Sequence, residues 1–244
     1  MTMVDDRSPR RYEAAQKVTG AARYAGEVRA SDMLHAALVT APMPSARVLG
    51  IDTARARALT GCAEVLTHEN ALRIPPASFL TLLQEPLVHF AGQPVAMVLA
   101  EAPETARAAA AAVKVRYAPM PAITALAQAR AASFAPRTAG LTATDSRRGE
   151  PEAGLAAAAV QLDQRYTTPT HNHLPIEPQV VLADWDGSAL TVHTPSQAVF
   201  AHRAALAKCF GVDVARVRVI SRYLGGGFGS KGSAWFPCLV LGCL

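Results

Sequence analysis

Apolar residues in the first half of the chain follow patterns that predict one α/β unit over residues 12–120. Four segments have strand-like patterns. Residues 34–40 and 94–100 are apolar runs, and residues 47–52 and 113–117 alternate between apolar and polar positions. An alanine-rich segment at 103–112 begins with proline and carries Glu104 in its first turn, which is typical of a helix. The sequence therefore predicts strand, helix and strand in a β-α-β arrangement with short connections.

The pattern changes at residue 121, where alanine, proline, threonine, serine and arginine dominate and hydrophobic periodicity fades. We interpret 121–149 as a linker and 150–232 as a second α/β unit. This second unit is expected to begin with a helix at 151–160 and a strand at 161–167, followed by a hairpin at 180–193 around Asp186-Gly187. A helix at 196–210, capped by Ser196 and Gly211, and a strand at 217–220 complete it. An apolar tail at 233–244 is expected to lack a packing partner and to favour aggregation.

Composition narrows the classes of protein to which the chain can belong. Its 244 residues are 50% hydrophobic and 18% charged, which is a globular composition that supports a sizeable core. No uninterrupted apolar run reaches about 18 residues, which argues against a transmembrane helix. Residues 1–11 lack the apolar region of a secretory signal. The net charge of +5 is spread along the chain without a basic, aromatic-rich strip, which argues against nucleic-acid binding.

Five glycines among residues 225–232 follow a predicted strand and expose main-chain amides, either to a ligand or in a tight structural turn. A phosphate-binding P-loop requires glycine before the lysine and serine or threonine after it, whereas Lys231 lies between Ser230 and Gly232. A dinucleotide fingerprint matches in form only, because no acid follows about 20 residues later. Lys231 itself is expected either to meet a phosphate or to be a solvated loop residue.

Two histidines and an acid, His171, His173 and Glu177, lie close together in the sequence and have the residue types of a metal site. Their spacing supplies three candidate ligands and no fourth. A turn rich in hydrogen bonds is the interpretation that we favour for this segment.

The glycine-rich segment Gly-Gly-Gly-Phe-Gly-Ser-Lys-Gly resembles the GGGFGxK signature of the molybdenum-binding large subunit of the xanthine dehydrogenase and aldehyde oxidase family. Other segments resemble landmarks of that family in the same order, from its opening segment and first strands to its H-N-P-x-E-P motif and its pterin-contacting glutamine: 17–25, 34–39, 46–52, 92–96, 115–117, 171–178 and 194–197. The resemblance implies an α/β (α+β) fold, with an a/b hammerhead domain at 11–120 and the start of a molybdopterin-binding domain at 150–232.

The resemblance also implies a cofactor, a molybdenum ion held by a pterin, which in bacterial members is usually the molybdopterin cytosine dinucleotide. By resemblance the cofactor-binding residues are Gln197, Gly226, Gly227, Phe228 and Gly229. Gln197 and Phe228 would approach the ligands of the metal without binding the metal itself. We therefore expect Gln197 and the loop to lie close in space and to face one cavity.

The chain departs from the family in ways that shape the functional hypotheses. The family's large subunit is far longer, and its general base lies near the end of that longer chain, so the resemblance places no catalytic residue here. Purine-oxidising members carry a glutamate four residues after the loop phenylalanine, where this chain has Gly232. We therefore interpret the chain as the N-terminal portion of an aldehyde oxidoreductase subunit that converts an aldehyde to a carboxylic acid with water as the oxygen source.

Alternatives are a non-catalytic assembly or docking module, a non-functional remnant of that subunit, and a xanthine dehydrogenase-type purine hydroxylase. The expected partners are iron–sulfur and FAD subunits of a heteromeric complex, and an aldehyde substrate. Four cysteines without a paired motif favour a reducing compartment, so we expect a cytoplasmic location. A periplasmic location through an export signal on a partner subunit is the alternative.

Overall fold

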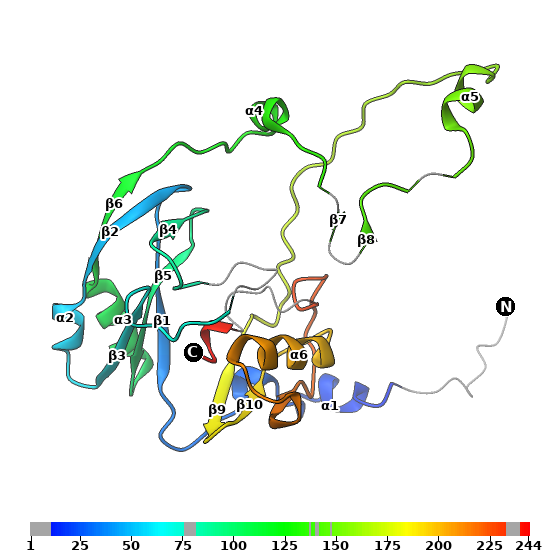
Figure 1. Ribbon diagram of the computed structural model, residues 1–244. Coiled ribbons are helices and arrows are strands. Elements are labelled where there is room, and N and C mark those ends of the chain that lie inside the picture. Colours follow the sequence, from blue (N-terminus) through cyan, green and yellow to red (C-terminus); the bar gives the residue numbers. More distant parts are fainter. Residues whose placement is uncertain (1–10, 76–81, 137, 140–141, 147, 233–239) are drawn as a thin grey trace. The chain divides into compact units, whose positions relative to one another are not determined.

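The computed structural model describes the whole chain except residues 1–10, 76–81, 137, 140–141, 147 and 233–239 (Figure 1). Two compact units are present. The first combines the residues up to Pro121 with His173–Leu244, and the second is Ala122–Asn172. The described residues of the first unit form three three-stranded sheets, together with a short N-terminal helix α1 (Ala14–Val18) and a 3-10 turn η1 (Ala25–Glu27).

The first sheet has the order β1-β5-β3, with bounds His35–Thr40, Pro94–Ala100 and Cys62–Thr67, and both pairings are antiparallel. The central strand, β5, is an uninterrupted apolar run and is buried at six of its seven positions. Two helices, α2 (Ala54–Arg57) and α3 (Pro103–Ala112), pack beside this sheet, where Ala109 of α3 shares a core cluster with Val98 of β5. The expected strands and the expected 103–112 helix are confirmed here.

The second sheet has the order β4-β2-β6, with bounds Leu87–Val88, Ala46–Asp52 and Lys114–Pro119. The expected β-α-β arrangement is wrong, because β5 and β6 belong to different sheets and every pairing in both sheets is antiparallel. Strand β6 alternates between partly buried and exposed positions, whereas a strand inside a parallel sheet is covered on both faces. It pairs antiparallel with β2, with Ala46 opposite Pro119 and Asp52 opposite Lys114, and not with β5.

The third sheet has the order β11-β10-β9, with bounds Val217–Ile220, Ala189–His193 and Leu182–Asp186. Strands β9 and β10 form the expected hairpin, and its two-residue turn is Gly187-Ser188, with φ +58° at Gly187. Strands β10 and β11 are parallel, and α6 (Val199–Phe210) connects them, with a 3-10 turn η3 (Val214–Arg216) before β11. Helix α6 ends at Gly211 in the left-handed conformation, as the sequence predicts.

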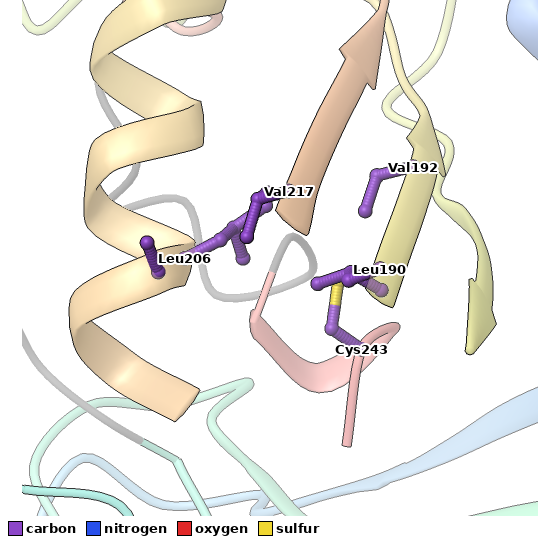
Figure 2. Close-up of a cluster of buried hydrophobic side chains, with 6 residues drawn as sticks. Leu190, Val192, Leu206, Val217 and Cys243 are labelled. Carbon is purple, nitrogen blue, oxygen red and sulfur yellow. The ribbon is translucent and has the colours of Figure 1, made fainter. Parts of the chain in front are cut away.

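Side chains from α6, β10, β11 and the C-terminal turn converge on one core (Figure 2). Leu190, Val192 and Leu206 are fully buried there, and Cys243 packs against them. Burial raises the pKa of the Cys243 thiol to about 12, which keeps it protonated. The expectation of an unpacked tail is wrong for Val240–Leu244, because Leu241 is also buried and the indole Nε1 of Trp185 donates to the Cys243 carbonyl at 3.0 Å. Residues 233–239 of that tail lie outside the described part.

The second unit, Ala122–Asn172, contains short elements with little buried surface. They are α4 (Leu126–Ala129), η2 (Arg130–Ala132), β7 (Thr138–Ala139), β8 (Thr142–Ala143) and α5 (Pro151–Ala156). The helix expected at 151–160 ends at Ala156. The strand expected at 161–167 is wrong, since these residues are exposed and pair with no described strand. Across the described residues, no helix combines the length and the apolar character needed to cross a membrane.

Limited trypsin digestion is expected to cut first after Arg130, Arg148 or Arg165, because these exposed arginines lie in the second unit, where few residues are buried. Arg107 and Arg116 lie in α3 and β6 and are expected to resist. Mass spectrometry of the early fragments checks the order. Initial cleavage after Arg107 or Arg116 would contradict the assignment of the stable unit.

Replacement of Leu206 by alanine is expected to lower the free energy of unfolding by about 2–5 kcal/mol, because the side chain is fully buried and its removal leaves a cavity. Leu162→Ala is the matched control, since Leu162 is 80% exposed and its truncation should change the free energy by less than about 0.5 kcal/mol. Urea unfolding followed by circular dichroism measures both. Equal effects of the two substitutions would refute the proposed core.

Candidate functional site

The glycine loop and Gln197 follow the C-terminal ends of two adjacent parallel strands. Strand β10 ends at His193, four residues before Gln197, and β11 ends at Ile220, five residues before Gly225. The strand ends are joined by hydrogen bonds from the Thr194 amide to the Ile220 carbonyl and from the Ser196 amide to Ser221 Oγ. Parallel strands bring their carboxyl ends to one edge of the sheet, which places both segments at the same edge.

Left-handed backbone conformations shape the loop. The φ angle is +95° at Gly226, +52° at Phe228 and +96° at Gly229. A non-glycine residue in this region carries strain, so Phe228 is held there by its surroundings. Its side chain is 74% exposed. The loop then closes on itself, because the amide of Ser230 donates to the Gly227 carbonyl at 2.9 Å and its hydroxyl donates to the same oxygen at 2.8 Å.

Gln197 is bound to the loop, as the sequence predicts. Its side-chain Oε1 accepts hydrogen bonds from the main-chain amides of Gly229 at 3.1 Å and Lys231 at 3.3 Å. The main-chain amide of Gln197 donates to the Lys231 carbonyl at 2.8 Å. A Cβ atom at Gly227 would lie 2.4 Å from Gln197 Oε1. Glycine is therefore required at 227 for Gln197 to approach the loop.

Three consecutive amides of the loop, those of Gly226, Gly227 and Phe228, donate to no acceptor among the described residues. Gly227 is itself a buried residue. Gly226 is half-buried and Phe228 is exposed, so solvent or a ligand can satisfy these donors, and the three amides are available to a group from outside the chain. The Nε2 group of Gln197 likewise donates to no described acceptor, since only its Oε1 is engaged.

Lys231 forms a buried ion pair with Glu177, and both sequence-based expectations for this lysine are wrong. Its side chain is 0% exposed, and its Nζ donates to Glu177 Oε2 and to the Glu177 carbonyl, both at 2.9 Å. The lysine is therefore neither solvated nor available to a phosphate. The two residues are 54 positions apart, and neither periodicity nor motif spacing indicates such a pair.

His173 and Pro175 flank the loop instead of forming a metal site. A Cβ atom at Gly226 would lie 3.4 Å from Pro175 Cβ, and one at Gly229 would lie 3.7 Å from His173 Nε2. In the part of the chain that the structure describes, no three side chains of histidine, cysteine, aspartate or glutamate gather closely enough to hold a metal ion.

A cavity of about 560 Å³ adjoins the first residue of the loop. Its lining includes Lys17, Tyr24, Glu177, Leu224 and Gly225, and Lys17 Nζ donates to the Leu224 carbonyl at 3.1 Å. Gln197 and Phe228 do not line this cavity. The expectation that Gln197 and the whole loop face one cavity is therefore wrong for this cavity. The expectation that Gln197 and the loop lie close in space is confirmed.

Two arginines precede the loop in the sequence, Arg218 in β11 and Arg222 shortly after β11. Burial lowers the pKa of His193, and the neighbouring Arg222 and Arg218 lower it further. His193 is therefore neutral at pH 7. The unbonded main-chain amides of the loop and the neutral side-chain amide of Gln197 suit a ligand with several hydrogen-bond acceptors. The residues present thus fit a pterin cofactor with a phosphorylated side chain and an oxygen-bearing metal.

Two family models match the chain in succession. Residues 19–121 match the "Aldehyde oxidase and xanthine dehydrogenase, a/b hammerhead domain", and residues 134–243 match the "Molybdopterin cofactor-binding domain". The two matches together span most of the chain. The fold class that the sequence predicts is confirmed.

Characterised relatives include the aldehyde oxidoreductase molybdenum-binding subunit PaoC of Escherichia coli K12, which is 35% identical over 225 residues. The xanthine dehydrogenase molybdenum-binding subunit of Escherichia coli O157:H7 is 30% identical over 241 residues. Each alignment covers 91% of this chain, but it covers only 30% of the first relative and 32% of the second. The chain therefore spans about a third of the length of these relatives.

Solved structures show the same likeness. Quinoline 2-oxidoreductase from Pseudomonas putida 86 superposes with a TM-score of 0.77 at 26% identity, over 97% of this chain and 32% of that one. The aldehyde oxidoreductase from Desulfovibrio gigas superposes with a TM-score of 0.71 at 25% identity, over 95% of this chain and 29% of that one. With both domain models and these relatives in agreement, the chain belongs to the aldehyde oxidase and xanthine dehydrogenase family and corresponds to part of its molybdenum-binding subunit.

Proposed function

We propose that the glycine loop and Gln197 form part of the binding site for the molybdenum–pterin cofactor of an aldehyde oxidoreductase. The observation that carries this proposal is the row of amides at Gly226, Gly227 and Phe228, which have no acceptor among the described residues. Such amides bind oxygen atoms or phosphate at close range, because no side chain of the glycines intervenes.

Gln197 supplies a neutral donor next to these amides. Its Oε1 is fixed by the amides of Gly229 and Lys231, so the Nε2 end of the side chain remains for a ligand. A glutamine donates without adding charge, which suits an acceptor atom of a pterin or an oxygen on the metal. When bound, the cofactor supplies the redox chemistry, and the chain supplies binding and orientation. Gly229 contributes by holding Gln197 in place, and Phe228 by the orientation of its main-chain amide.

The aldehyde substrate is favoured by the residue at position 232. Gly232 has no side chain, and its amide donates to the Gly229 carbonyl at 3.1 Å. A purine presents ring nitrogens that a carboxylate recognises, and this position offers none. Oxidation of an aldehyde to a carboxylic acid with oxygen from water is the reaction that we propose for the complete enzyme, with a purine hydroxylase as the alternative.

The proposal extends to the parts of the enzyme outside this chain. We propose the cytosine dinucleotide form of the cofactor, iron–sulfur and FAD partner subunits, and a cytoplasmic complex, all on the strength of the family resemblance. We also retain as proposals the domain limits of 11–120 for the hammerhead domain and 150–232 for the cofactor-binding portion, joined by a linker at 121–149.

An assembly role is the second candidate, and exposed apolar side chains favour it. Leu174, Ile176 and Phe228 are 84%, 99% and 74% exposed, and all three come from the loop or the segment beside it. Apolar surface of this kind is typical of a face that another protein segment covers. A chain that docks partners through this face while binding no cofactor would show partner binding without molybdenum.

Gly227→Ala is expected to reduce the molybdenum and pterin content of the chain at least about tenfold, because the new methyl group would displace Gln197, and loss of one good hydrogen bond to a charged group has this size. The chain is purified from cells that make the cofactor, and metal analysis and pterin fluorescence after oxidation are measured. Gly154→Ala is the matched control, since nothing lies within 4 Å of that position. A parent chain that carries no molybdenum or pterin would contradict the proposed function.

The chain by itself is expected to oxidise no aldehyde. Glu177, the carboxylate that contacts the loop, is 9% exposed and its Oε2 accepts bonds from Lys231 and Gly225, so we assign it a structural role and expect the general base to lie outside this chain. Loss of a general base costs about 10²–10⁴ in rate. Benzaldehyde oxidation with a dye acceptor is the assay. Molybdenum-dependent turnover by the parent chain would contradict this expectation and show that the base lies in this chain.

A further inference from the structure

We propose that the Lys231–Glu177 ion pair is a positioning device that holds the glycine loop in the shape that presents its three unbonded amides. The inference deepens the proposed function and rests on it only in naming the cofactor as the ligand. Both act here as positioning residues, since the Lys231 side chain is 0% exposed and Glu177 Oε2 is bound to Lys231 and to the Gly225 amide.

The pair joins the two ends of the loop. Glu177 Oε2 accepts from the Gly225 amide at 2.7 Å and from Lys231 Nζ at 2.9 Å. The Glu177 amide also donates to the Gly225 carbonyl at 3.2 Å. One carboxylate oxygen thus binds the first residue of the loop and the residue that closes it, and the amides of Gly226, Gly227 and Phe228 lie between these two attachments.

The glycine at 225 is explained by the same contact. A Cβ atom at that position would lie 2.5 Å from Glu177 Cβ, which is closer than any real contact. The backbone at 225 therefore approaches Glu177 only because it carries no side chain. Together with the contact of Gly227 and Gln197, this assigns two of the loop glycines to neighbouring side chains rather than to a ligand.

An ion pair is a costly way to fill this space, because both charges lose their hydration. Lys231 offers directional donors, and two of them meet the carboxylate and the carbonyl of one residue. An apolar pair would pack without fixing a direction. The charged pair therefore fixes the geometry of the loop, which an apolar pair of the same volume would not do.

The test compares Lys231→Met with the double variant Glu177→Gln/Lys231→Met in the full chain. The single variant leaves a buried carboxylate without its cation and is expected to lower the melting temperature. The double variant is neutral and keeps an acceptor for the Gly225 amide, so its melting temperature should return toward that of the parent. Lys114→Met is the matched control, because Lys114 is exposed on β6.

Amide hydrogen exchange of the peptides that cover residues 224–232, without cofactor, is the deciding readout. In the double variant we expect the hydrogen-bonded loop amides, those of Gly225, Gly229, Ser230 and Lys231, to exchange at least about tenfold faster than in the parent, the size expected for loss of one charge-assisted hydrogen bond. The molybdenum and pterin contents should fall in parallel. Lys114→Met should change neither.

Unchanged loop exchange in the double variant would overturn the inference, whatever its melting temperature. Faster exchange together with full cofactor content would also overturn it, because the loop shape would then be irrelevant to binding. Faster exchange in a chain whose parent carries no cofactor would support the positioning of the loop and would instead contradict the proposed function.

Discussion

Two polar side chains occupy the space that side chains at Gly225 and Gly227 would need, and the rest of the site depends on this exclusion. Glu177 fills the first space and Gln197 the second. Because both come from other parts of the chain, neighbouring segments fix the loop together with its own Ser230 and Lys231 side chains. The amides of Gly226, Gly227 and Phe228 then remain without acceptors, a state that costs free energy unless a ligand or solvent satisfies them.

The sheet topology makes this arrangement possible. Helix α6 links two parallel strands, and the carboxyl ends of those strands deliver Gln197 and the loop to the same edge. The fully buried core of Leu190, Val192 and Leu206 holds helix and strands together. A ligand site at the carboxyl edge of parallel strands thus follows from a short β-α-β unit, although the remaining sheets of the chain are antiparallel.

Local patterns predicted the elements well where burial is periodic or continuous. The run at 94–100 became the central strand β5, and proline with an acid marked the start of α3. The same patterns failed where partners decide the outcome: residues 161–167 pair with no described strand, and β5 and β6 joined different sheets. Motif resemblance located Gln197 and the loop, yet it missed the Lys231–Glu177 pair, because a contact between residues 54 positions apart leaves no periodic signal in a single sequence.

The role of the three amides is measured by hydrogen exchange of the loop with and without bound cofactor. We expect the amides of Gly226, Gly227 and Phe228 to become protected when the chain carries molybdenum and pterin, while those of Gly229 and Lys231, already bonded to Gln197, change little. If the three amides of the loaded chain exchange as fast as those of the cofactor-free chain, the cofactor does not bind at the loop.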